Sequence, residues 1–276
     1  MSRRHPSLRL GLAALALGSL ALVAGCAADT GADAGTDADA TTVIRVGAVT
    51  SPMTDVVEAA AEEIADGYEI ELVEVADYVT INNMLAAGDI DANFSQHEPY
   101  MTEFNEKNDA SLVAVQPIYN FVIAFYSKFI DDIDELAEGD TVAIPNDSSN
   151  TGRALKLLAD EDVITLAEGV DPYAATVDDI AENPKGLEFL QVQINQLNTA
   201  YDEAALVFQW PSHISALGLT PQDDGLITEL DERFALQLVV PESEVDSEAV
   251  AALTAAMTSD AVREVIEGNE TIAVAF

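Results

Sequence analysis

The 276-residue chain carries 50 aspartate and glutamate residues against 11 lysine and arginine residues, which gives a formal net charge of −39 at pH 7. A surface of that sign repels nucleic acid and anionic lipid head groups, so neither is an expected partner. The one cysteine excludes an intramolecular disulfide and a zinc site of cysteine ligands, so the fold must depend on a hydrophobic core.

The first 26 residues have the pattern of an export signal. Three arginines precede an apolar run over residues 10–23, and small residues then lead to Cys26. The run is shorter than the roughly 20 residues of a membrane-spanning helix, which disfavours a transmembrane anchor. The segment resembles a bacterial lipoprotein signal, and this resemblance implies that Cys26 becomes the lipidated first residue. We therefore expect a protein anchored by lipid at the extracytoplasmic face of the cell membrane.

Residues 27–41 consist of alanine, aspartate, glycine and threonine without apolar periodicity. As a flexible coil of about 15 residues, this segment would span roughly 20 Å on average. We predict a tether between the lipid and a folded part that begins at Thr42.

From residue 42 to 126 the chain alternates strands and helices. The apolar periodicities predict strands over 43–49, 68–75 and 90–94. They predict a helix that follows the first strand and ends at about 66, and further helices over 81–87 and 98–107. Such alternation is typical of βαβ units and a mainly parallel sheet. The β-rich run over 112–126 is long enough to lead the chain into a second lobe.

The second half of the chain repeats the order of strand, polar turn and helix. Its predicted elements are a strand over 141–145, a helix over 153–160, strands over 187–192 and 205–208, a helix over 211–217, a strand over 236–240, and helices over 246–257 and 259–267. We predict an α/β protein of two lobes. Lobe 1 comprises 42–124 and 231–276, and lobe 2 comprises 125–230.

Two strand-to-helix turns, residues 94–99 and 145–153, carry the hydrogen-bonding groups expected of a ligand site. Ligands of open α/β sheets bind where strands end, and free N–H groups at a helix start hold anions. Arg153 adds a planar cation that can bind a carboxylate in two places. Ordinary capping by residues 146–151 explains the second turn equally well.

No motif indicates catalysis, a cofactor or a metal. The sequence has no Gly-x-Ser-x-Gly elbow, P-loop or dinucleotide fingerprint. His97 and His213 lack a third ligand at metal-like spacing. Tyr78, Tyr100, Tyr119 and Phe121 lie near predicted strand ends, where each either lines a pocket or belongs to the core. We expect a binding protein rather than an enzyme.

Motifs in a fixed order span residues 43–276. The most specific is Gly-Asp-Ile-Asp-Ala-Asn followed by Gln-His-x-Pro-Tyr, within Gly88 to Tyr100. The others are Asp77-Tyr-Val79, Tyr126-Ser-Lys128, Val142-Ala-Ile-Pro-Asn-Asp147, Asn150-x-Gly-Arg153, Glu182-Asn-Pro-Lys185 and Gly218-Leu-Thr-Pro221. Together they resemble the NlpA family, the methionine-type substrate-binding lipoproteins of ABC importers. The resemblance implies a two-lobed type-2 periplasmic-binding-protein fold with a ligand cleft between lobes. It also implies a permease and its ATPase subunit as partners.

The resemblance also implies which side chains contact the ligand. The contacts kept in this chain are Tyr78, His97, Tyr100, Asn150 and Arg153. Arg153 would hold the carboxylate of an amino acid, and the aromatic rings would pack against its side chain.

Three positions depart from the family's pattern. Ser95 stands where members usually have Phe, and Trp210 and Leu236 stand where they usually have Asn. Loss of a polar partner for a buried charged group costs about 1–3 kcal/mol. Ser95 and Trp210 are counted among the candidate contacts. Trp210 can enlarge the apolar wall of the site or stack on a different ligand.

We therefore expect a non-enzymatic substrate-binding lipoprotein of an ABC importer. Its ligand would be methionine or a related apolar amino acid, derivative or short peptide, bound by closure of the lobes. The alternative hypothesis is a surface interaction protein that retains the fold but binds no ligand.

Overall fold

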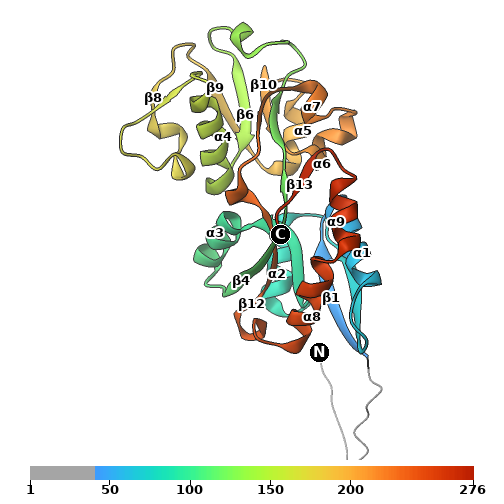
Figure 1. Cartoon of the computed structure of the whole chain (residues 1–276). Helices are drawn as coiled ribbons and strands as arrows, with labels where there is room; N and C mark the ends of the chain where they lie inside the picture. The colour runs from blue at the N-terminus through green and yellow to red at the C-terminus, as the bar shows by residue number, and fades with distance from the viewer. Residues whose placement is uncertain (1–40) are drawn as a thin grey trace, which may run out of the picture. The chain divides into compact units, whose positions relative to one another are not determined.

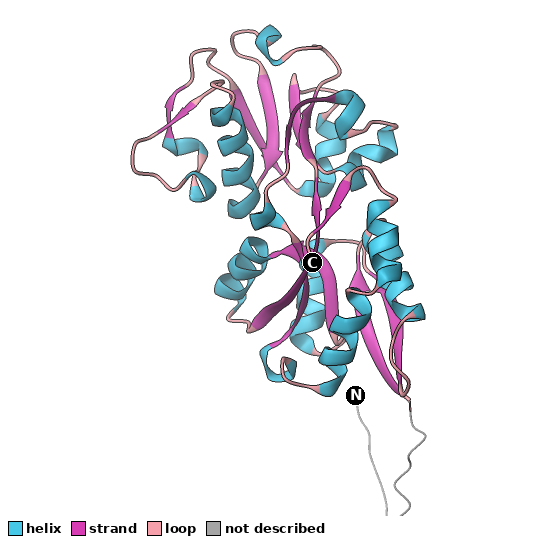
Figure 2. Cartoon of the chain, viewed as in Figure 1, coloured by secondary structure: helices cyan, strands magenta, loops and turns pink. Residues whose placement is uncertain are grey.

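Two β-sheets organise the computed structural model, which describes residues 41–276 (Figures 1 and 2). The predicted signal, Cys26 and all but the last residue of the predicted tether lie outside the described residues. The strands are β1 (Thr42–Ala48), β2 (Tyr68–Glu74), β3 (Ala92–His97), β4 (Leu112–Phe121), β5 (Ile123–Tyr126), β6 (Thr141–Pro145), β7 (Thr165–Leu166), β8 (Ile180–Glu182), β9 (Glu188–Val192), β10 (Leu206–Gln209), β11 (Gly225–Glu229), β12 (Leu236–Pro241) and β13 (Ile272–Val274). The α-helices are α1 (Met53–Glu62), α2 (Tyr78–Ala87), α3 (Glu98–Asn108), α4 (Ser148–Asp160), α5 (Leu197–Ala200), α6 (Pro211–Ile214), α7 (Pro221–Asp224), α8 (Glu248–Met257) and α9 (Asp260–Glu267).

The first sheet has six strands in the order β13-β4-β12-β3-β1-β2. Strands β2, β1 and β3 are parallel, whereas β12 is antiparallel to both of its neighbours and β13 is antiparallel to β4. The predicted mainly parallel sheet is therefore wrong, because three of the five strand pairings in this sheet are antiparallel. The physical reason is that β12 returns from the second sheet and does not follow a βαβ crossover.

Helices cover both faces of the first sheet, because apolar side chains of β1 and its neighbours point to both sides. On one face, α1, α8 and α9 bury a core that includes Val57, Leu253 and Ile266. On the other, α2 and α3 bury a second cluster that includes Ile81 and Phe104. We call the first sheet with these helices lobe 1.

The second sheet has five strands in the order β11-β5-β10-β6-β9. Strand β6 is parallel to β9 and β10, and β5 is antiparallel to β10 and β11. Helix α4 packs Leu155 and Leu158 into the core of this sheet. We call the second sheet with its helices lobe 2.

The chain passes between the sheets twice. The first passage is at Val122, since β4 and β5 belong to different sheets, and the second lies between Glu229 and Leu236. The single predicted run over 112–126 is therefore two strands. The strand predicted over 90–94 lies at 92–97, because the polar residues Ser95, Gln96 and His97 are buried and continue it.

Side chains that cap three helices bring the candidate residues to the junction of the two lobes. Asp77 caps α2 and accepts hydrogen bonds from the N–H groups of Val79 and Thr80, at 3.0 and 2.8 Å. His97 caps α3 through its Nδ1, and Asp147 caps α4. The starts of these three helices lie together, since Asp77, Tyr100 and Asp147 line one cavity.

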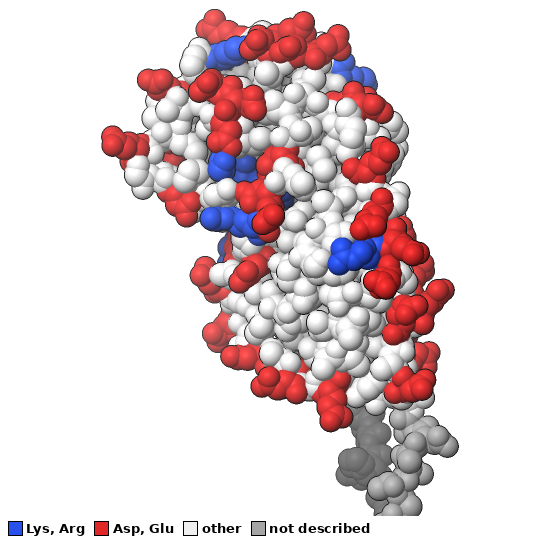
Figure 3. Space-filling view, viewed as in Figure 1, with Lys and Arg blue, Asp and Glu red and all other residues white. Residues whose placement is uncertain are grey.

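The described surface is strongly acidic. Figure 3 shows Asp and Glu side chains spread over the visible face, with few Lys or Arg side chains among them. Within residues 41–276, no helix has both the length and the apolarity to cross a membrane.

Candidate ligand site

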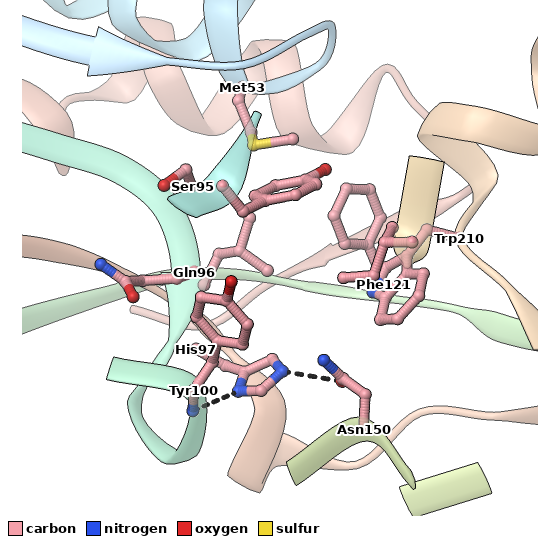
Figure 4. Close-up of a pocket in the computed structure, with 11 residues that line it drawn as sticks. Met53, Ser95, Gln96, His97, Tyr100, Phe121, Asn150 and Trp210 are labelled. Carbon is pink, nitrogen blue, oxygen red and sulfur yellow. Dashed lines mark hydrogen bonds between the residues drawn. The ribbon is translucent and has the colours of Figure 1, made fainter. Parts of the chain in front are cut away.

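An inner pocket of about 30 Å³ lies between the two lobes (Figure 4). Its walls combine aromatic, aliphatic and neutral polar side chains. They are Met53, Tyr78, Ser95, Gln96, His97, Tyr100, Phe121, Asn150, Ile194, Trp210 and Leu236. Residues from both lobes, including residues at the starts of α1, α2, α3 and α4, thus meet at one cavity, as expected of a ligand site in an α/β protein.

A larger outer cavity of about 590 Å³ adjoins the inner pocket and shares Tyr78, Tyr100 and Ile194 with it. The charged side chains on its walls are Asp77, Glu103, Asp147 and Lys107. Lys107 pairs with Glu103 on the same helix. The charge of the outer cavity is therefore predominantly negative.

His97 joins lobe 1 to lobe 2 at the base of the inner pocket. Its Nδ1 accepts a hydrogen bond from the N–H of Tyr100 at 3.2 Å, and its Nε2 donates to Oδ1 of Asn150 at 3.0 Å (Figure 4). This arrangement requires the neutral tautomer with its proton on Nε2. Burial and the nearby positive charge of Arg153 lower the pKa of His97 to about 3. The imidazole is therefore uncharged at neutral pH.

Tyr78 makes a second link between the lobes. Its hydroxyl lies 2.9 Å from Nε2 of His213, on α6. Burial raises the pKa of Tyr78 and lowers that of His213, so both groups are neutral. Burial and nearby carboxylates likewise raise the pKa of Tyr100. The two phenols therefore remain hydrogen-bond donors at neutral pH.

Glu103 forms a third link and caps the start of α4 from lobe 1. Its carboxylate accepts hydrogen bonds from the backbone N–H groups of Ser148 and Ser149 and from the Ser148 hydroxyl, each at 3.2 Å. Free N–H groups at a helix start attract negative charge. These bonds and the pairing with Lys107 hold the pKa of Glu103 below its usual value, although burial acts in the opposite direction.

A buried amide network fixes the strand that carries His97. Asn82 on α2 exchanges hydrogen bonds with Gln96 at 2.7 and 2.6 Å, and it accepts another from Asn93 at 2.7 Å. All three side chains are buried. Because the three amides satisfy one another's hydrogen-bonding groups, the side chain of Gln96 is held in a fixed position in the pocket wall.

Apolar groups occupy the rest of the inner pocket. Trp210 is 7% exposed and packs edge-to-face against Phe208, with ring centroids 5.3 Å apart. Leu236 and Ser95 also line the pocket, so all three positions that depart from the family's pattern face the cavity. The Ser95 hydroxyl oxygen is buried and has no hydrogen-bond partner among the described residues.

Arg153 is the one candidate contact that does not line the inner pocket. Its Nε and Nη2 donate to the two carboxylate oxygens of Glu229 at 2.7 and 3.1 Å. The guanidinium also lies over the ring of Phe234, 4.1 Å from its centroid. The other six candidates, Tyr78, Ser95, His97, Tyr100, Asn150 and Trp210, meet in the pocket.

Two lining residues, Met53 and Ile194, were not predicted from the sequence. Met53 begins α1 after the turn that follows β1, a turn of the same kind as 94–99, so the order of strand and helix could have identified it. Ile194 follows β9 without any such feature. Among residues 41–276, no group of three His, Cys, Asp or Glu side chains is placed to hold a metal ion.

Comparison with known proteins relates this geometry to one family. The D-methionine-binding lipoprotein MetQ of Escherichia coli K12 is 39% identical over 253 residues, which is 90% of each chain. The structure of a nutrient-binding protein from Burkholderia cenocepacia bound to methionine has a TM-score of 0.80 and 31% identity, and the match covers 84% of this chain and all of that one. An ABC transporter periplasmic substrate-binding protein from Coxiella burnetii has a TM-score of 0.77 and 30% identity, over 82% and 96% of the two chains.

The family model of the NlpA lipoproteins matches residues 44–274, which includes all but the ends of the described part. The match spans both sheets and every residue of the inner pocket. The two-lobed fold of the methionine-bound relative agrees with the fold expected from the sequence. The chain therefore belongs to the NlpA lipoprotein family.

Proposed function

We propose that this protein is the lipid-anchored substrate-binding component of an ABC importer, and that it binds methionine or a related apolar amino acid, derivative or short peptide. The names of its relatives support this function, since they include methionine-binding lipoproteins and an ABC transporter substrate-binding protein. No catalytic step is part of the proposal.

The observation that carries the proposal is the convergence of six predicted contacts on one pocket between the lobes. Aromatic rings and Leu236 suit an apolar side chain, while Asn150 and the Ser95 hydroxyl can hydrogen-bond polar groups of the ligand. We propose these six residues as the ligand contacts. Arg153 remains a predicted contact whose cation is paired with Glu229 in this conformation.

Binding would proceed by separation and closure of the lobes. A cavity of about 30 Å³ has room for about two water molecules, since each needs about 10–15 Å³, and is therefore too small for an amino acid. A ligand therefore needs an open state, and the links made by His97, Tyr78 and Glu103 would stabilise the closed one. We propose lobe boundaries near residues 124 and 230.

The partners that we propose follow from the role of the protein in an ABC importer. A permease with its ATPase subunit would receive the ligand from the closed form. A lipid on Cys26 would hold the protein at the extracytoplasmic face of the cell membrane, with residues 27–41 as the tether. Nucleic acid is not a proposed partner, since the net charge of −39 opposes binding.

Native mass spectrometry of freshly purified protein tests the proposal, followed by calorimetry with L-methionine, D-methionine and methionine-containing dipeptides. We expect a co-purified small molecule, or saturable binding of at least one compound. Trp210→Ala should change the order of affinities among these ligands. Saturable binding that Trp210→Ala and Tyr100→Ala leave untouched would contradict the proposed site.

A ligand-free surface interaction protein is the second candidate. It is favoured by the three departures Ser95, Trp210 and Leu236, which all line a small pocket. A ligand present at 100 times its Kd stabilises the fold by about 2.7 kcal/mol. Absence of any thermal shift across amino acids and dipeptides, together with no co-purified mass, would favour this candidate.

A further inference from the structure

A short 3₁₀ helix, η6 (Glu232–Phe234), lies in the second passage between the lobes. It belongs to neither sheet, so its contacts determine the lobe with which it moves. Its buried residue Phe234 touches both lobes. The ring centroid of Phe234 lies 5.0 Å from that of His97 in lobe 1 and 4.1 Å from the guanidinium carbon of Arg153 in lobe 2. The other contacts of the passage are therefore decisive.

Tyr173, in the 3₁₀ helix η2 (Pro172–Ala174) of lobe 2, contacts three residues of the passage. Its hydroxyl donates a hydrogen bond of 2.5 Å to the carboxylate of Asp231, the residue that caps η6. The guanidinium carbon of Arg233 lies 3.8 Å from the centroid of the Tyr173 ring, and the centroid of the Phe234 ring lies 5.7 Å from it. Both a charged acceptor and a cation over the ring strengthen these contacts. We call the contacts of Tyr173 with Asp231 and Arg233 the clamp.

Tyr173 is itself fixed on lobe 2. Its carbonyl oxygen packs so closely on Gly152 of α4 that a Cβ atom there would lie 2.3 Å away. The Nζ of Lys156, also on α4, lies 5.5 Å from the centroid of the Tyr173 ring. The hydrogen bond with Asp231 and burial raise the pKa of Tyr173 to about 12, so its hydroxyl remains a donor at neutral pH. The clamp therefore joins η6 to a fixed part of lobe 2.

Lobe 1 holds the passage more weakly. Among residues 41–276, no hydrogen bond or ion pair joins residues 231–234 to lobe 1, and Phe234 packs edge-to-face against His97. One such aromatic contact is weaker than a charge-assisted hydrogen bond combined with a cation–π contact. When the lobes separate, the contact between Phe234 and His97 is therefore the one that breaks.

A single residue separates η6 from the sheet of lobe 1. Ala235 follows η6 directly, and Leu236 already pairs with His97 and Tyr119. In the first passage, Val122 likewise separates β4 from β5. Because β4 and β12 are antiparallel neighbours, Val122 and Ala235 lie at the same end of the sheet. Residues at the ends of elements commonly act as hinges.

We propose that Tyr173 is a positioning residue for ligand binding, which holds η6 on lobe 2 so that the lobes pivot at Val122 and Ala235. Residues 230–234 then move with lobe 2, although the chain leaves the second sheet at Glu229. Closure brings Phe234 against His97, which is part of the wall of the inner pocket, and opening withdraws it. Without the clamp, the whole passage would have to be ordered at each closure, which costs conformational entropy. The proposal rests on the proposed function for the separation of the lobes.

Distances between spin labels test which lobe η6 follows. Labels are introduced in pairs at exposed positions through Glu58→Cys in lobe 1, Glu188→Cys in lobe 2 and Glu232→Cys in η6. Every variant also carries Cys26→Ser, so that no other cysteine takes a label. In ligand-free protein, double electron–electron resonance should give a broad distance distribution between the lobes and between lobe 1 and η6, but a narrow one between η6 and lobe 2. L-methionine should narrow the two broad distributions and leave the third unchanged.

Tyr173→Phe tests the clamp, because it keeps the ring and removes the hydroxyl. It should broaden the distribution between η6 and lobe 2 and speed the release of L-methionine several-fold in stopped-flow measurements. Tyr201→Phe is the matched control, since its hydroxyl donates to the carbonyl of Ser127 within lobe 2, at 3.0 Å. The control should change neither the distances nor the release rate. A structural role alone would lower the free energy of unfolding without changing either measurement.

Three outcomes would overturn the proposal. The first is a fixed distance between η6 and lobe 1 together with a variable distance between η6 and lobe 2. The second is a Tyr173→Phe variant with the distances and release rate of the wild type. The third is three narrow distributions that L-methionine does not alter, which would exclude the lobe motion itself. If L-methionine alters no distance, but the ligand-free wild type shows the expected pattern and Tyr173→Phe broadens it, the methionine function fails and the role of Tyr173 stands.

Discussion

At the scale of single residues, His97 is the side chain through which strand β3, helix α3 and helix α4 meet. It ends the strand, caps one helix through Nδ1 and donates to Asn150 on the other through Nε2. Both ring nitrogens are therefore used by the neutral imidazole. Protonation would put a second donor at Nδ1, facing an N–H group that can only donate.

This geometry predicts a pH dependence of stability. The pKa of His97 is about 3 in the folded protein and near 6.5 in an unfolded chain, so only the unfolded state takes up a proton between these values. Stability is lost as the pH falls through this window. Between pH 7 and pH 5, His97 should lower the free energy of unfolding by about 2 kcal/mol.

Urea denaturation of the wild-type protein and of His97→Gln, each at pH 7 and at pH 5, measures the contribution of His97 to this loss of stability. The variant should lose about 2 kcal/mol less than the wild type, because glutamine does not titrate. Carboxylates and His213 titrate in both proteins and cancel in the difference. Equal losses would mean that His97 is charged, or exposed, in the folded protein.

Residues inside sequence motifs were the ones that could be predicted. His97, Tyr100 and Asn150 occur at strand ends and helix starts, where chain order alone brings side chains to a common edge. Glu229 could not be predicted as the partner of Arg153, since the two residues are 76 positions apart and lie in different elements. Whether an arginine is available to a ligand depends on such a distant carboxylate.

At the scale of elements, helix α4 depends on capping from both lobes. Asp147 caps it from its own lobe through the N–H of Asn150 at 2.9 Å, and Glu103 caps it from lobe 1. The second cap exists only while the lobes are together. Closure is therefore coupled to the satisfaction of N–H groups at one helix start.

Glu103→Gln should weaken the closed form by about 1 kcal/mol, since a neutral amide accepts hydrogen bonds less strongly at a helix start. The expected results are a several-fold faster release of ligand in stopped-flow measurements and a larger radius of gyration without ligand. Glu106→Gln, at an exposed position of the same helix, is the matched control. Equal release rates in both variants would exclude the interlobe cap as a latch.

Helix α4 also needs a glycine where it meets the 3₁₀ helix η2 (Pro172–Ala174). A Cβ atom at Gly152 would lie 2.3 Å from the carbonyl oxygen of Tyr173. Gly152→Ala should therefore lower the free energy of unfolding by about 2 kcal/mol or more, despite the better helix propensity of alanine. Gly268→Ala, where the nearest atom would be 3.2 Å away, should cost less in the same urea titration. The reverse order would contradict the packing described for α4.

At the scale of the whole molecule, the acidic surface predicts a response to salt. A net charge of −39 destabilises the folded chain by self-repulsion, which salt screens over about 10 Å at 0.1 M and about 3 Å at 1 M. The thermal midpoint should therefore rise from about 0.05 M to about 1 M salt, equally for sodium and potassium chloride. A midpoint that is flat or falls would show that paired charges outweigh the repulsion.

The two-lobed α/β fold could be predicted, but the strand order of lobe 1 could not. Local periodicity identifies β1, β2 and β3, and their parallel pairing follows from the helices between them. The location of β12 depends on a return from lobe 2 over more than a hundred residues, which no local pattern encodes. The sequence predicts the strand over 236–240 and its return to lobe 1, but not its antiparallel pairing with β3 and β4.

The location of β12 has a consequence for the order in which the protein can be completed. Strand β12 (Leu236–Pro241) lies in the middle of the six-stranded sheet, between β4 and β3. A growing chain that has not yet reached residue 236 therefore has two unpaired strand edges at the centre of lobe 1. Lobe 2, whose strands all precede β12, can finish its own sheet earlier. The lobe that begins the chain is thus the last to become whole, and its interior edges are the part of the nascent protein most exposed to mispairing.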